Sequence, residues 1–261
     1  MRKINSTRRG ILARGAAFIG AAALAGCDKV INSDQAASAF KSVDALNRKA
    51  QQAILQAQQL APEYTEADIS PKFYANGSTD PDDPAYKAMV TDGFKDYRLQ
   101  VTGMVDTPLS LSLADLRAMP ARTQITRHDC VEGWSCIGKW TGVPLSLVLD
   151  KAGVKPTAKY LVFQCFDTMD DPSSMSGPPP FYGSIDLLGA HHPQTILAYD
   201  MNGKALEVPF GAPLRLRLER QLGYKMTKYI KEIQLVDSFA EIGQGKGGYW
   251  EDNGYQWYAG I

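Results

Sequence analysis

The sequence of 261 residues is poor in the residues that usually reveal a metal or haem centre. It has three histidines and four cysteines, no Cys-x-x-Cys pair and no Cys-x-x-Cys-His segment, which excludes covalently attached haem. It shows no internal repeat and no apolar run of the roughly 20 residues that span a membrane. Hydrophobic residues make up 44% and charged residues 21%, a balance that excludes a disordered chain, a collagen and a coiled-coil rod.

The charge is balanced in total but unevenly distributed. The chain has 28 basic and 28 acidic residues, and residues 1–26 contain five of the basic ones and no acidic one. The remainder has 23 basic and 28 acidic residues, a net charge near −5. A mildly acidic body argues against nucleic acid as the main partner.

The basic N-terminal segment has the features of an export signal. Residues 7–12 read Thr-Arg-Arg-Gly-Ile-Leu, a twin-arginine pattern, and an apolar run of signal-peptide length follows at 16–26. The run ends in Leu-Ala-Gly-Cys at 24–27, which resembles a bacterial lipobox, so Cys27 would be acylated and become the new N-terminus. The alternative is an ordinary signal-peptidase site with Cys27 incidental. We expect residues 1–27 to be a signal segment that directs a periplasmic, lipid-anchored protein through the twin-arginine route, whose usual cargo carries a cofactor.

Three further segments follow the signal. Residues 28–68 are predicted to be a helical N-terminal arm whose helix stops at Pro62, because apolar residues recur at alternating spacings of three and four. These positions are Val43, Leu46, Ala50, Ala53, Ala57 and Leu60. Alanine at most of them makes a weak coiled-coil seam, so a helix packed on its own domain or a spacer from the membrane is favoured. Residues 69–240 are predicted to be the main domain, opened by a loop at 69–84, and 241–261 a glycine-rich aromatic tail.

The main domain is predicted to be α+β, with many short strands, few helices and no repeated βαβ unit. Strands are expected at 97–103, 124–128, 160–166, 195–201, 204–208, 214–218 and 229–236. Helices are expected at 111–119, closed by Pro120, and at 144–152, with proline in the first turn and Gly153 at the end. Asn202-Gly203 between two strands predicts a tight hairpin.

Three cysteines remain if Cys27 is lipidated, namely Cys130, Cys136 and Cys165. An odd number leaves at least one thiol unpaired or bound to a ligand. A Cys136–Cys165 disulfide would leave Cys130 alone. Zinc held by these thiols and His128 is a weaker alternative, because the spacing fits no usual pair of zinc knuckles.

The segment around Cys130 carries a specific resemblance. Residues 127–135 read Arg-His-Asp-Cys-Val-Glu-Gly-Trp-Ser, and residues 140–145 read Trp-Thr-Gly-Val-Pro-Leu. Over residues 73–236 the chain resembles the molybdopterin-binding domain of the sulfite oxidase superfamily, in particular its bacterial branch of periplasmic protein-methionine-sulfoxide reductases. The resemblance implies a sulfite-oxidase-type fold, a molybdenum–molybdopterin cofactor and Cys130 as the metal ligand. A thiolate is a soft donor that suits oxidised molybdenum, whereas an isolated cysteine is more often a buried structural residue.

The resemblance also implies which residues bind the rest of the cofactor. Its phosphate needs cations or backbone donors, and Gly-Ala-Pro-Leu-Arg at 211–215, with Lys228 thirteen residues later, has the family's spacing. Phe-Tyr-Ala-Asn at 73–76 matches an early segment of the family, and the strand after the ligand supplies further contacts. The implied cofactor-binding residues are Tyr74, Asn76, Cys165, Asp167, Arg215, Met226, Thr227 and Lys228. Taken singly, such residues are more often surface or turn residues, so their joint order and spacing carry the inference.

The sequence departs from the family at two places. Relatives have His or Asn before the Gly-x-Pro-x-Arg run, where this chain has Phe210, so one cofactor hydrogen bond is lost or made elsewhere, with His191 and His192 as candidates. The segment after Cys130 lacks the two arginines of animal and plant sulfite oxidases, which favour an anionic substrate. This puts sulfite in doubt unless other basic residues compensate. The residues considered for that role are Arg122, Arg127, His128 and Arg217.

The tail holds five aromatic residues within 249–258. Sulfite oxidases have a Trp and, five residues later, a Tyr whose hydroxyl lies at the active site, and Trp250 and Tyr255 share that spacing. We expect Tyr255 to be a catalytic residue in the pocket of Cys130, with Tyr249 as the alternative. The other interpretation is an aromatic strap packed over the domain's own apolar surface.

These expectations combine into an exported molybdenum oxidoreductase. It would transfer an oxygen atom to or from a small or protein-bound acceptor, by reduction of an S-oxide or by sulfite-type oxidation. We expect electrons to be exchanged with a separate partner, a cytochrome or a membrane haem subunit. The alternative function is a non-catalytic lipoprotein that keeps the fold as a binding or assembly module. The presence of Cys130, Arg215 and Lys228 argues against this alternative.

Overall fold

The computed structural model describes residues 46, 49–50, 59–169 and 177–261. The chain forms two compact units, Met1–Ile54 and Leu55–Ile261. The predicted signal segment and most of the predicted arm lie outside the described residues. Leu46 and Ala50 are helical, whereas Leu60 and Pro62 are not, so the helix expected in the arm does not reach Pro62. No helix in the described parts of the chain is long and apolar enough to cross a membrane.

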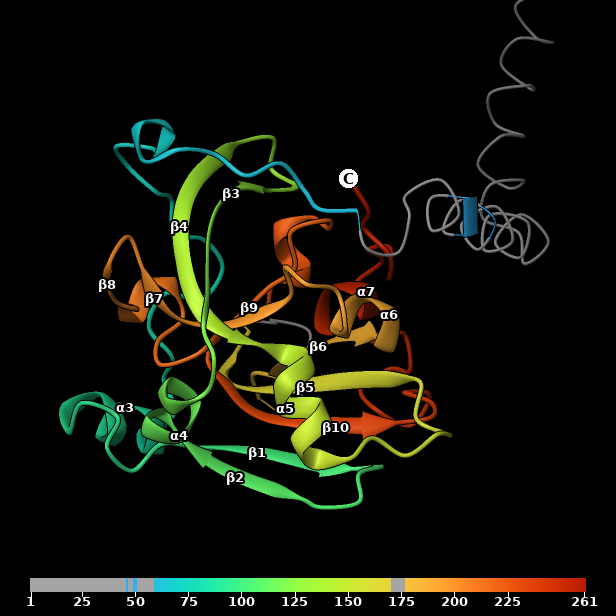
Figure 1. The fold of residues 1–261 in the computed structure, drawn as a ribbon. Coiled ribbons are helices and arrows are strands. Elements are labelled where there is room, and N and C mark those ends of the chain that lie inside the picture. Colours follow the sequence, from blue (N-terminus) through green and yellow to red (C-terminus); the bar gives the residue numbers. More distant parts are fainter. Residues whose placement is uncertain (1–45, 47–48, 51–58, 170–176) are drawn as a thin grey trace, which may run out of the picture. The chain divides into compact units, whose positions relative to one another are not determined.

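Two five-stranded sheets form the frame of the second unit (Figure 1). The first has the strand order β2-β1-β10-β5-β6, in which β1 and β10 are parallel and the other neighbours antiparallel. Its strands are β1 (Arg98–Gly103), β2 (Leu109–Ser112), β5 (Tyr160–Thr168), β6 (Pro180–Asp186) and β10 (Ile230–Val236).

The second sheet is antiparallel, with the order β3-β4-β7-β8 and β9 paired to β7. Its strands are β3 (Arg122–Asp129), β4 (Ser135–Pro144), β7 (Ile196–Met201), β8 (Lys204–Ala205) and β9 (Arg215–Arg217). Strand β4 is long and strongly curved (Figure 1).

The described helices are short. The α-helices are α3 (Pro84–Thr91), α4 (Leu113–Ala118), α5 (Leu145–Ala152), α6 (Leu187–Ala190) and α7 (Tyr249–Asp252). The 3₁₀ turns are η1 (Glu66–Asp68), η2 (Val208–Phe210) and η3 (Gly223–Lys225). Mixed sheets with few short helices confirm the predicted α+β class.

Where local signals were strong, the elements form as predicted. Helix α5 ends at Gly153, whose φ of 69° suits a left-handed C-cap and whose N–H bonds the Leu149 carbonyl. Asn202 and Gly203 both have positive φ, 51° and 78°, as a type I′ hairpin between β7 and β8 requires.

Several parts of the secondary structure differ from expectation. The helix expected at 111–119 begins only at Leu113, because Leu111 and Ser112 pair with β1 and the Ser112 hydroxyl caps the helix by accepting from the Asp115 N–H at 3.1 Å. The strand expected at 204–208 stops at Ala205, and β4 and β6 were not predicted. Glycines at 138, 142 and 183 interrupt the apolar pattern of these two strands.

The main hydrophobic core lies between the sheets and helix α5. Leu99 and Val101 of β1, Leu161 and Phe163 of β5 and Leu149 of α5 are all fully buried in it. Burying each such side chain contributes roughly 1.5–3 kcal/mol. This core includes residues of β5 and β10, and Asp167 and Lys228 lie at or next to the ends of these two strands.

Candidate functional site

Nine of the ten residues predicted for the site line one cavity. They are Tyr74, Asn76, Cys130, Asp167, Arg215, Met226, Thr227, Lys228 and Tyr255. They are spread along the chain from Tyr74 to Tyr255, so the fold and not the local sequence brings them together. The lining does not include Cys165, which is buried in β5 opposite Ile230. The structure therefore does not support a direct contact between Cys165 and a ligand of this cavity.

Cys130 lies at the start of a tight turn after β3. Its N–H bonds the Trp134 carbonyl at 2.9 Å, and its carbonyl accepts from the Gly133 N–H at 3.0 Å, where φ is 88°. The turn leaves Cys130 8% exposed at the cavity, with the Asn76 side-chain amide 3.2 Å from Sγ. Burial raises the pKa of this thiol, and the nearby Glu132 carboxylate adds to the rise. A cation bound at Sγ would reverse that balance and favour the thiolate.

The other two cysteines that the structure describes, Cys136 and Cys165, are free thiols. Cys136 and Cys165 form no disulfide, and Cys136 Sγ lies 3.7 Å from the Lys72 carbonyl, outside the cavity lining. Within the described residues, no group of three or more His, Cys, Asp or Glu side chains could hold a metal ion. The zinc alternative therefore has no geometry to support it.

Two cations meet at the other part of the cavity. Lys228 Nζ donates to the carbonyls of Asn76, at 2.9 Å, and Ser78. Arg215 donates from one terminal nitrogen to the Phe210 carbonyl at 2.9 Å, while its buried Nε has no partner. Burial, together with Arg215, lowers the pKa of Lys228 to about 7. Burial and the charge of Arg217 lower the pKa of Arg215 to about 9. An anion placed here would relieve both charges.

Two further polar atoms in the lining have no partner. Asp167 Oδ1 and Thr227 Oγ1 are buried without a hydrogen bond. Burial raises the pKa of Asp167 to about 7. A buried unpartnered polar atom costs about 1–3 kcal/mol, so these atoms and Arg215 Nε are poised for a polar ligand. A cavity with a thiol, two cations and three unsatisfied polar atoms fits a ligand that combines a soft metal, a phosphate and a heterocycle.

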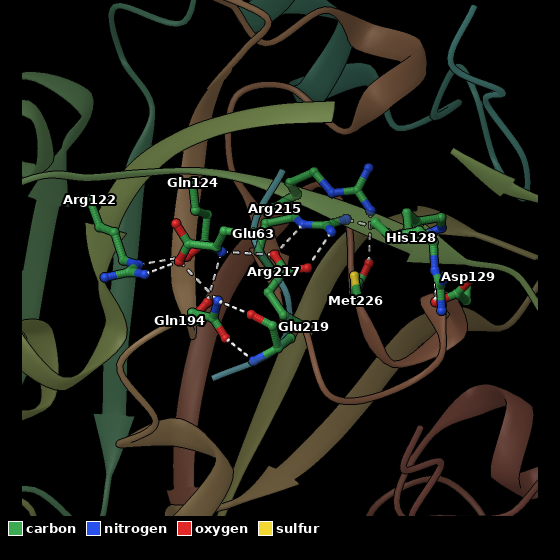
Figure 2. A network of polar contacts seen from close by, with 12 residues as sticks. Glu63, Arg122, Gln124, His128, Asp129, Gln194, Arg215, Arg217, Glu219 and Met226 are labelled. Atoms are coloured by element: carbon green, nitrogen blue, oxygen red, sulfur yellow. Dashed lines mark hydrogen bonds and ion pairs between the residues drawn. The ribbon is translucent and has the colours of Figure 1, made fainter. Parts of the chain in front are cut away.

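His128 joins the cavity to a buried polar network (Figure 2). Its Nδ1 lies 3.0 Å from a terminal nitrogen of Arg217, which forms a fully buried ion pair with Glu219. The network continues through Gln124, whose amide donates to Glu219 at 2.8 Å, and reaches Gln194 (Figure 2). Burial lowers the pKa of His128 well below its usual value, and the charges of Arg217, Arg215 and Lys228 act in the same direction.

The suggested substitutes for Phe210 and for the missing arginines are placed differently from expectation. His192 Nε2 contacts the Gln59 carbonyl at 3.0 Å, and neither His191 nor His192 lines the cavity, so neither makes the missing hydrogen bond. Arg127 pairs with Asp129, and Arg122 pairs with Glu63. Arg217 is buried behind His128. Of the four basic residues considered as compensation, His128 is the one that lines the cavity.

The C-terminal tail contributes a wall of the cavity and also packs as a strap. Trp250 and Tyr255 both line the cavity, with ring centroids 5.2 Å apart, and Tyr255 is 37% exposed. Tyr249, the alternative, packs against Phe181 and does not line the cavity. Trp257 stacks on Phe239 at 5.8 Å, away from the cavity. The catalytic role of Tyr255 stays a prediction.

Comparison with known proteins decides the family. The family model described as an oxidoreductase molybdopterin binding domain matches residues 86–241, more than half of the chain. The chain belongs to this family. It is therefore an oxidoreductase with a molybdopterin-binding domain, as the segments around Cys130 and Arg215 indicated.

Several members of this molybdopterin-binding family are similar over long stretches. A protein of Azospira oryzae, provisionally named protein-methionine-sulfoxide reductase subunit YedZ1, is 36% identical over 253 residues, which are 97% of this chain and 87% of the relative. The protein-methionine-sulfoxide reductase catalytic subunits MsrP of Xanthomonas campestris pv. campestris and Xanthomonas axonopodis pv. citri are 39% and 38% identical over 176 residues. Those matches cover 65% of this chain and 53% of each MsrP, so the chain aligns with about half the length of these two relatives. Among solved structures, the sulfane dehydrogenase SoxCD of Paracoccus pantotrophus matches 55% of this chain and 39% of its own, with 27% identity and a TM-score of 0.47.

The cavity is also lined by residues that the sequence analysis did not propose as cofactor-binding. Phe73, Gly223 and Tyr224 line the cavity. Gly223 has a steric reason, because a Cβ there would lie 2.4 Å from the His128 ring. The sequence did contain a signal that His128 lines the same cavity as Cys130. His128 stands two residues before Cys130, and alternate residues of a strand share a face.

Proposed function

We propose that this chain catalyses oxygen-atom transfer and reduces S-oxides, with electrons from a separate redox partner. The observation that carries the proposal is the position of Cys130, whose thiol opens into a cavity that is also lined by two cations, Arg215 and Lys228, which hydrogen-bond to backbone carbonyls. The names of the relatives support the direction of the reaction, because they are protein-methionine-sulfoxide reductases.

The residues of the cavity divide into groups by the part of the cofactor that each would hold. Cys130 would bind the molybdenum, with the Asn76 amide fixing its Sγ. Arg215 and Lys228 would hold the phosphate, and Asp167 and Thr227 would meet the polar edges of the pterin. When bound, the cofactor supplies a two-electron centre that gives or accepts an oxygen atom.

The groups near Cys130 favour an uncharged substrate. Glu132 lines the cavity, and its carboxylate is fixed by the Trp134 indole N–H at 2.8 Å. A carboxylate beside the reacting position repels an anion such as sulfite. Tyr74 and Val131 in the lining are 50% and 48% exposed, which gives the cavity an apolar border. A neutral S-oxide with an apolar substituent matches both features.

A reduced-dye assay on molybdenum-loaded protein tests the proposal. The panel contains S-oxides, N-oxides and, in the oxidative direction, sulfite. We expect turnover of S-oxides above that of sulfite, and a Glu132→Gln variant with a smaller preference. Sulfite oxidation without S-oxide reduction would refute the proposed reaction.

The cellular setting is part of the same proposal. We propose export by the twin-arginine route, a lipid on Cys27 that holds the protein to the periplasmic face of a membrane, and a cytochrome or membrane haem subunit as the electron donor. The pattern at residues 7–27 supports export. Fractionation with metabolic lipid labelling checks it, with Cys27→Ala as the control. Absence of lipid label on the wild-type protein would refute the proposed lipid anchor. Retention of the protein in the cytoplasm would refute the proposed export.

A further inference from the structure

The imidazole of His128 has one tautomer imposed on it. Its Nδ1 lies 3.0 Å from a terminal nitrogen of Arg217. A guanidinium has only donors, so Nδ1 must accept, and the ring hydrogen then sits on Nε2. His128 thus presents an N–H, and not a lone pair, at its other end.

The guanidinium of Arg217 is held in place on three sides. It donates to both oxygens of Glu219, at 2.9 and 2.6 Å, and its carbon lies 4.3 Å from the centroid of the Trp140 ring. Arg217 and Glu219 side chains are fully buried. A planar fork fixed in this way cannot turn from Nδ1 without breaking a buried ion pair.

The Nε2 end of His128 makes no hydrogen bond within the described part of the chain. His128 is 5% exposed and lines the cavity, with Phe73 and Trp134 ring centroids 5.6 and 5.7 Å away. Gly223 packs against the Cε1–Nε2 edge of the ring, where any side chain would clash, because a Cβ there would lie 2.4 Å from Nε2. No partner for Nε2 is found among residues 59–169 and 177–261. An N–H donor on a cavity-lining side chain that makes no hydrogen bond to the described protein is available to a ligand in that cavity.

We propose that His128 donates a hydrogen bond from Nε2 to an acceptor atom of the bound molybdopterin, and that Arg217 is the positioning residue that imposes the donor tautomer. The acceptor is a ring nitrogen, a carbonyl oxygen or a sulfur of the cofactor. The inference rests on the family's cofactor and not on the direction of the reaction.

Cofactor retention tests the contact. Molybdenum and pterin are quantified during dialysis of loaded protein, so the readout does not depend on turnover. His128→Leu should release the cofactor roughly fivefold faster, the factor that one hydrogen bond of typical strength supports. His128→Gln, which keeps an amide donor near Nε2, should release it more slowly than His128→Leu does. The matched control is His192→Leu, a buried histidine outside the cavity, with wild-type retention. Wild-type retention in His128→Leu, or equal loss in His192→Leu, would overturn the proposal.

The tautomer is measured without any substitution in the cavity. Long-range ¹⁵N–¹H spectra of histidine-labelled loaded protein resolve three imidazoles, and we expect one to be neutral with its hydrogen on Nε2. That signal should become a mixture of tautomers in the double variant Arg217→Met/Glu219→Gln, which removes both buried charges together. A His128 ring with its hydrogen on Nδ1 in the wild type, or one unchanged in the double variant, would refute the role of Arg217.

Discussion

The buried ion pair between Lys225 and Glu251 leads to a prediction about the free energy of unfolding. Lys225 ends η3, directly before the Met226–Lys228 segment of the cavity, and Glu251 lies in α7 next to Trp250. Their side chains are 1% and 4% exposed, and the Lys225 ammonium lies 5.4 Å from the centroid of the Trp257 ring. This pair therefore ties the C-terminal tail to the cavity wall.

Glu251→Gln would leave the Lys225 ammonium buried without a counter-charge. Removing one partner of a buried pair costs about 3–5 kcal/mol, whereas replacing both by apolar residues is close to neutral. Burial already lowers the pKa of Lys225 although Glu251 opposes the shift, so the variant lowers it further. The folded variant then binds fewer protons than the unfolded chain, and its stability recovers as the pH rises toward about 10.

Urea denaturation at about pH 7 and about pH 10 measures this effect. Glu251→Gln should lose about 3–5 kcal/mol at the lower pH and less at the higher one. The double variant Lys225→Met/Glu251→Leu should lie near wild type, which completes a double-mutant cycle. A loss below about 1 kcal/mol in Glu251→Gln, or a double variant as unstable as the single one, would refute the reasoning.

Three shorter predictions concern the cavity. Arg215→Ala should weaken retention of molybdenum and pterin about tenfold to a hundredfold with little change in turnover per bound metal, because charge-assisted bonds are strong; full occupancy in metal analysis would contradict this. Tyr255→Phe should reduce S-oxide turnover by about tenfold or more at unchanged molybdenum content, while Tyr249→Phe should have no effect. Equal turnover in both variants would refute a catalytic role for Tyr255 and favour the interpretation of the tail as a packing strap. In cofactor-free protein the raised pKa of Asp167 means that the folded state binds more protons, so stability falls as the pH rises from about 4 to about 7. Asp167→Asn should flatten that fall in urea midpoints, and an identical pH profile would contradict the assignment.

Much of the fold was predictable because its signals are local. Gly153 ends α5, and Asn202-Gly203 forms the β7–β8 turn, since few other residues adopt positive φ at low cost. The start of α4 was mispredicted because Leu111 belongs to a strand only by pairing with Leu99, a contact that no local pattern encodes.

The candidate site shows the same division. The family resemblance implied Asn76, Arg215 and Lys228, and the structure brings them to the cavity of Cys130. It did not reveal the orientation of His128, because that depends on Arg217, 89 residues away in the chain. Cys165 was selected by its place after the ligand, but its position in β5 takes it out of the cavity lining.

The central claim is that Cys130 supplies the thiolate that holds the metal, and molybdenum X-ray absorption tests it directly. Spectra are compared for loaded wild type, Cys130→Ser and Cys136→Ser, since Cys136 is a buried thiol outside the cavity. We expect Cys130→Ser to lose one sulfur neighbour of the molybdenum and Cys136→Ser to match the wild type. A spectrum of Cys130→Ser with the full set of sulfur neighbours would contradict the account.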